Sequence, residues 1–99
     1  MSPLLTEVIS RWQQMFAALV AGNDLPPGQR LRTEGLMEAV ILLGELTPDK
    51  LQQQMDKAYR EAFGRSLSEE YGGQWQDFYL FPQIPAMARR APVYPSTTE

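Results

Sequence analysis

The sequence contains neither cysteine nor histidine. It can therefore form no disulfide, and it lacks the thiol nucleophile, the usual zinc ligands and the base of a Ser–His–Asp triad. Glu34, Glu38 and Glu45 share one helical segment, but di-metal carboxylate bundles also need histidine ligands. We interpret these glutamates as solvated side chains near Arg30 or Arg32. The expectation is a protein that is not an enzyme and uses no metal or cofactor.

Long apolar runs are also missing. The most apolar stretch, residues 39–44, is six residues long and lies between two glutamates, whereas a membrane-spanning helix needs about 20 apolar residues. The N-terminus has no basic region of the kind that precedes an export signal. Gly72-Gly73 has neither the strand nor the Lys-Ser/Thr that accompany a phosphate-binding loop. We expect a cytoplasmic protein that makes no membrane contact.

Positive charge is scarce in most of the chain. Residues 1–81 carry seven basic and eleven acidic side chains, whereas residues 82–99 carry Arg89, Arg90 and Glu99. An acidic body repels the phosphate backbone of nucleic acids. Nucleic acid is therefore not the expected partner.

What is present is a helical pattern in a chain of 99 residues, 43% of them hydrophobic, which suits one globular domain. Ser2 and Pro3 form a cap and first turn, and a helix is predicted from Pro3 to about Ala21. Its apolar residues recur at spacings of three and four and cover an arc of about 160°. The opposite side of its second half carries Ala17, Ala18 and Ala21, which indicates packing on two sides.

Two more long helices follow. The second begins at either Pro27 or Thr33, and its apolar part, residues 35–46, contains four non-hydrophobic positions. We predict that this segment is a central helix, because a buried strand would have no second strand to pair with. Thr47 and Pro48 start the third helix, which ends at Gly64.

The last third of the chain is less regular. Ser66 and Glu69 form a capping box, the glycine pair interrupts the helix, and a second short turn should reach about Phe81. Four prolines then exclude a long regular element. The predicted fold is all-α: a compact bundle of four to five helices over residues 1–81, with an extended Pro-rich C-terminal arm over residues 82–99.

Five of the ten aromatic residues lie between Tyr71 and Phe81. We favour the interpretation that Trp75 and Phe78 close the core, since large aromatic side chains are mostly buried. In the functional alternative, exposed aromatics and the neighbouring arm contact a partner, because Tyr, Trp and Arg are enriched at interfaces. The candidate partner-binding residues on that view are Trp75, Tyr79, Phe81, Arg89, Arg90 and Tyr94.

The predicted function is a non-enzymatic protein-interaction or regulatory module that binds another protein or itself as a homodimer. The main alternative is a DNA-binding, helix-turn-helix-like domain with helices near 34–46 and 48–63. The residues that could then touch DNA are Gln52, Gln53, Gln54, Lys57 and Arg60. A small-ligand pocket lined by Met15, Met37 and Met55 is a third interpretation, although methionines more often fill gaps in a core.

Deleting residues 89–99 tests the arm. If the arm serves a partner, the free energy of unfolding should change by less than about 1 kcal/mol, since surface segments contribute little, while association weakens. Thermal melting and light scattering measure the two effects. A large drop in melting temperature with unchanged association would instead make the arm structural.

Overall fold

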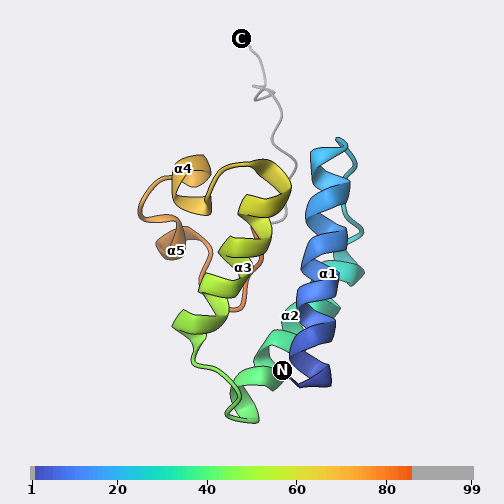
Figure 1. The fold of residues 1–99 in the computed structure, drawn as a ribbon, viewed down its shortest axis with the longest axis vertical. Coiled ribbons are helices and arrows are strands. Elements are labelled where there is room, and N and C mark those ends of the chain that lie inside the picture. The colour runs from blue at the N-terminus through green and yellow to red at the C-terminus, as the bar shows by residue number, and fades with distance from the viewer. Residues whose placement is uncertain (1, 86–99) are drawn as a thin grey trace.

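The computed structural model describes residues 2–85, which form five helices and contain no strand (Figure 1). The three long helices are α1 (Pro3–Val20), α2 (Pro27–Leu42) and α3 (Pro48–Phe63), and the two short ones are α4 (Leu67–Tyr71) and α5 (Trp75–Phe78). The predicted all-α architecture is thus confirmed for this part of the chain.

Helices α1 and α3 begin with the same local device. The Ser2 hydroxyl accepts a hydrogen bond from the Leu5 N–H (3.0 Å), and the Thr47 hydroxyl accepts one from the Lys50 N–H (3.3 Å). In each case proline occupies the first turn, where a missing N–H costs nothing. Both starts agree with the sequence prediction because the capping chemistry is local.

Helix α2 begins without a side-chain cap, at the earlier of the two predicted positions. It also ends at Leu42, four residues before the predicted end, and Gly44 follows with a positive φ of 72°. Residues 43–47 then form the corner that leads into α3.

The central helix is α1 rather than α2. Helix α1 packs against both α2 and α3, whereas the backbones of α2 and α3 make little contact with each other. In Figure 1, α2 lies behind α1, and α4 and α5 lie on the side of α3 that faces away from α1. The prediction of a central helix over residues 35–46 is therefore wrong: one side of α2 packs against the body, and no element within residues 2–85 covers the other.

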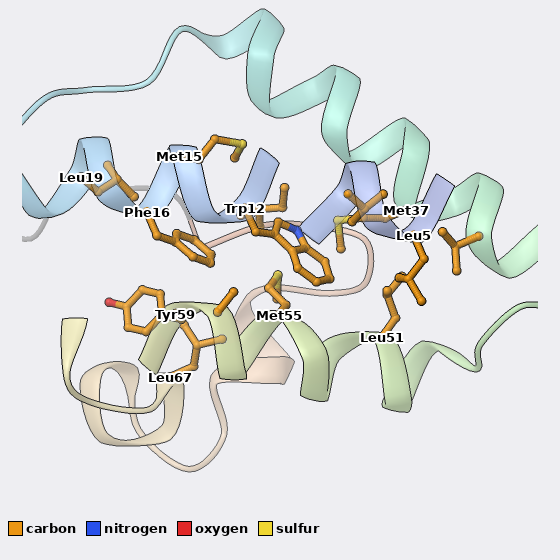
Figure 2. Close-up of a cluster of buried hydrophobic side chains, with 14 of the residues drawn as sticks. Leu5, Trp12, Met15, Phe16, Leu19, Met37, Leu51, Met55, Tyr59 and Leu67 are labelled. Atoms are coloured by element: carbon orange, nitrogen blue, oxygen red, sulfur yellow. The ribbon is translucent and has the colours of Figure 1, made fainter. Parts of the chain in front are cut away.

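The core forms mainly between α1 and α3 (Figure 2). At its centre lie Trp12 of α1 and Met55 of α3, both with no exposed surface. An aromatic series extends the core toward α4: the Phe16 and Tyr59 rings meet edge to face at 5.1 Å, and Tyr59 stacks on Phe63 at 4.2 Å. The apolar arc of α1 is the largest contribution, through Leu5, Val8, Trp12, Met15, Phe16 and Leu19.

Polar contacts attach the short helices to α3. The Leu67 N–H, at the start of α4, donates to Asp56 Oδ1 (2.7 Å), and Gln76 Nε2 donates to Gln52 Oε1 (3.0 Å). The predicted capping box is present, and the Ser66 backbone N–H donates to the Glu69 carboxylate (2.8 Å). This bond lowers the pKa of Glu69, so the cap is complete at neutral pH and is weakened when acid protonates the carboxylate.

The segment after α5 returns to the body. Ile84 and Pro85 are buried, so the first residues of the predicted arm cover the core. The rest of the arm, residues 86–99, lies outside the described residues. No helix in the described range is both long and apolar enough to cross a membrane.

Replacing Trp12 tests the core. Trp12→Ala should lower the free energy of unfolding by about 3–5 kcal/mol, because a fully buried aromatic side chain leaves a cavity between α1 and α3. Urea denaturation measures the change, and the exposed neighbour variant Gln13→Ala is the control, with an effect within about 0.5 kcal/mol. Similar effects for the two variants would contradict the position of Trp12 at the centre.

Candidate interaction surface

The predicted partner-binding residues lie in different environments in the structure. Trp75 is 6% exposed and belongs to the core, which matches the favoured structural interpretation. Tyr79 and Phe81 are half-buried, and the Tyr79 ring meets Tyr71 edge to face at 5.3 Å. The other three candidates, Arg89, Arg90 and Tyr94, lie outside the described residues. The structure does not describe the side chain of Phe78 either.

Three of the four strongly exposed leucines within residues 2–85 lie instead on α2 and its C-cap. Leu31, Leu42 and Leu43 are 56%, 86% and 68% exposed. Single exposed apolar residues are ordinary on protein surfaces. Three exposed leucines on one helix and its C-cap are a different feature, because a helix with apolar residues on several sides is normally buried.

Four residues of α2 form one narrow exposed stripe, which we call the α2 stripe: Leu31, Gly35, Glu38 and Leu42. At 100° per residue they lie within about 60° of one another. Their spacing of four, three and four is the spacing of residues that face a neighbouring helix in a coiled coil. The stripe points away from the buried side of α2, which consists of Thr33, Glu34, Met37 and Val40.

Glu34 fixes the buried side of α2. Its side chain is 10% exposed, and its Oε2 accepts hydrogen bonds from Arg30 Nη1 (2.8 Å) and from the Ile84 N–H (2.9 Å). One carboxylate oxygen thereby joins two turns of α2 to the segment after α5. A buried carboxylate needs such partners, so the interpretation of Glu34 as a solvated side chain is wrong, although its nearness to Arg30 was predicted.

A groove of about 300 Å³ runs between α1 and α3. Ile9 and the buried Ala58 lie in it, with Lys57 and Glu61 among the exposed residues that border it. Its remaining lining residues are Thr6, Ser10, Gln13 and Gln54. Charges of both signs and an open, polar lining select no particular class of ligand.

The structure buries several residues on which the two alternative interpretations depend. Met15, Met37 and Met55 have no exposed surface and fill the core. Gln52, which would face DNA in the helix-turn-helix alternative, is buried against the body. No group of three or more metal-ligating side chains occurs within residues 2–85.

Comparisons with protein-family models, curated proteins and solved structures give no match for this chain. The geometry of the described residues is therefore the ground for a functional proposal. The sequence contains the signal of the α2 stripe, since Leu31 and Leu42 lie eleven residues apart, which is about three helical turns. It was missed because residues 35–46 were expected to be buried on all sides.

Replacing Glu34 tests the attachment of the C-terminal segment. Glu34→Ala should lower the free energy of unfolding by about 1–3 kcal/mol, because the buried Ile84 N–H loses its acceptor. Glu34→Gln keeps an oxygen for Ile84 and should cost less. Urea denaturation gives the energies, and amide hydrogen exchange at Ile84 should accelerate in the alanine variant.

The matched control is Glu38→Ala, which removes an exposed glutamate one turn later on α2 and should change stability by less than about 0.5 kcal/mol. Equal losses for Glu34→Ala and Glu34→Gln would assign the effect to the Arg30 ion pair instead of the Ile84 hydrogen bond.

Proposed function

We propose that the chain is a non-enzymatic protein-interaction module that binds its partner through the exposed side of α2, including Leu31, Leu42 and Leu43. The observation that carries the proposal is the mismatch between the composition of α2 and its surroundings. The helix is apolar on several sides, yet among the described residues it packs against the body by one side alone. A partner that covers the exposed leucines would remove this mismatch.

The rigidity of the helix supports the same proposal. Glu34 and the buried side of α2 hold the helix against the body, so the leucines are presented in a fixed arrangement. A surface that is ordered before binding loses little conformational entropy when the partner docks. Helix faces with anchors at spacings of three, four and seven residues are a recurring mode of protein recognition.

The size of the surface indicates a reversible interaction. Burying one leucine side chain contributes about 1.5–3 kcal/mol, so three leucines supply on the order of 6 kcal/mol. Association itself costs about 4–15 kcal/mol in lost translational and rotational freedom. The expected complex is therefore weak unless the partner adds further contacts.

The double variant Leu42→Ser/Leu43→Ser tests the proposal. It should abolish binding of the partner captured by the wild-type chain, or abolish self-association, while the free energy of unfolding changes by less than about 1 kcal/mol, because both side chains are exposed. Affinity capture with mass spectrometry identifies the partner, and light scattering measures self-association.

Leu80→Ser is the control, because Leu80 is 62% exposed and lies outside α2. It should bind as the wild-type chain does. Equal loss in both variants would show nonspecific apolar adhesion. A salt-sensitive shift of duplex DNA that is lost when Lys57 and Arg60 are changed to glutamate would favour the DNA-binding alternative.

A further inference from the structure

We infer that the partner of the α2 stripe is a second copy of this chain, bound with the two α2 helices antiparallel across a twofold axis. This inference rests on the proposed function and names the occupant of the same surface. It comes from the order and chemistry of the four exposed stripe residues.

The spacing of the stripe is symmetric. Leu31 and Leu42 lie 5.5 residues on either side of a midpoint between Leu36 and Met37, and Gly35 and Glu38 lie 1.5 residues on either side of it, as the numbering of the sequence gives. A twofold axis through this midpoint places Leu31 of each copy against Leu42 of the other. Twofold interfaces require such self-complementary surfaces, in which each contact occurs twice.

The inner pair of residues fits the same axis. In the antiparallel arrangement, Glu38 of one copy lies opposite Gly35 of the other, so a long side chain meets a position with no side chain. A Cβ at Gly35 would have no neighbour within 4 Å in the isolated chain, which leaves room over the backbone for the approaching glutamate.

A parallel arrangement fits less well. It would pair Leu31 with Leu31 and Leu42 with Leu42, but it would also set the two Glu38 carboxylates directly opposite each other and leave an empty space between the two glycines. Like charges that face each other across a helix interface destabilise it. The antiparallel alignment staggers the carboxylates by three residues, or about 4.5 Å along the helix.

The limited length of the stripe sets the expected strength. Its ends are about 16 Å apart, so the buried area falls below that of a standard stable interface, and the dimer should be weak. We expect a monomer near 1 µM and a growing dimer fraction toward about 1 mM. Analytical ultracentrifugation over this concentration range measures the equilibrium.

The absence of native cysteine allows the alignment to be tested by disulfide cross-linking. A mixture of Leu31→Cys and Leu42→Cys chains should form a mixed disulfide dimer under mild oxidation, because the two positions face each other. Leu31→Cys alone should form little disulfide. In the antiparallel dimer the Leu31 positions of the two copies lie about three helical turns apart, or about 16 Å along the helix, which is beyond the reach of a disulfide. Leu80→Cys alone, an exposed position outside α2, gives the background of random collisions.

Substitutions test the energetic role of the stripe. Leu31→Ser and Leu42→Ser should each weaken the dimer by at least about tenfold, since each leucine is buried twice in a twofold dimer. Leu80→Ser should leave the dissociation constant unchanged within about twofold, because Leu80 is exposed but lies outside α2. Glu38→Gln should tighten the dimer by about twofold by removing the like charges.

Three results would overturn the inference: a wild-type chain that remains monomeric near 1 mM, efficient cross-linking of Leu31→Cys with itself, or a dimer that survives Leu42→Ser. A monomeric chain that still captures a different protein through Leu42 and Leu43 would retain the proposed function and reject the second copy as its partner. A chain that captures nothing and does not self-associate would reject both.

Discussion

Helix α1 supplies the packing on which the other elements depend, because both α2 and α3 lie against it while they make little contact with each other. This is possible because the apolar arc of α1 is wide, about 160° on a helical projection. Trp12 and Phe16 fill the space toward α3, and Met15 meets the α2 side, where the Thr33 hydroxyl lies 3.6 Å from its sulfur. One helix thus serves two neighbours, and neither neighbour needs the other to bury its inner side.

The two helices that pack against α1 differ in how much of their remaining surface is covered by other elements. Helix α3 gains further cover from α4 and α5, to which Asp56 and Gln52 are hydrogen-bonded. In the part of the chain that the structure describes, helix α2 is covered only on its buried side, where Glu34 accepts the Ile84 N–H. A buried carboxylate with two donors is costly to disturb, so this contact fixes α2 in place without shielding its outer leucines. The same interaction that completes the core therefore leaves the α2 stripe as a rigid, exposed surface.

The sequence predicted those features that depend on neighbouring residues. Ser2 with Pro3, Thr47 with Pro48, and Ser66 with Glu69 mark helix starts through bonds within one turn, and all three are present. The position of α2 could not be read in this way, because an apolar segment shows that burial is favourable but not which of its sides a neighbour will cover. Likewise, the contact between Glu34 and Ile84 joins residues fifty positions apart, and no local pattern announces it. Burial of Trp75 was the favoured interpretation, but the exposed α2 leucines that carry the proposed site were not anticipated.

Gly35 and Glu38 decide how the exposed stripe is best understood. Glycine in the middle of a helix costs about 1 kcal/mol relative to alanine, and nothing within the described residues needs it, since a Cβ there would meet no neighbour and Gly35 is not among the glycines with positive φ. Glu38 likewise interrupts what would otherwise be a continuous apolar seam.

If the stripe were selected only for maximum apolar surface, both residues would be unfavourable choices. Leucine at all four positions would bind many partners without favouring one alignment. A small residue and a charged residue placed symmetrically between two leucines lower the affinity but make one alignment better than its alternatives, as polar residues do within coiled-coil seams. The stripe therefore has the composition of a surface that selects a particular orientation of its partner, at the cost of some binding strength.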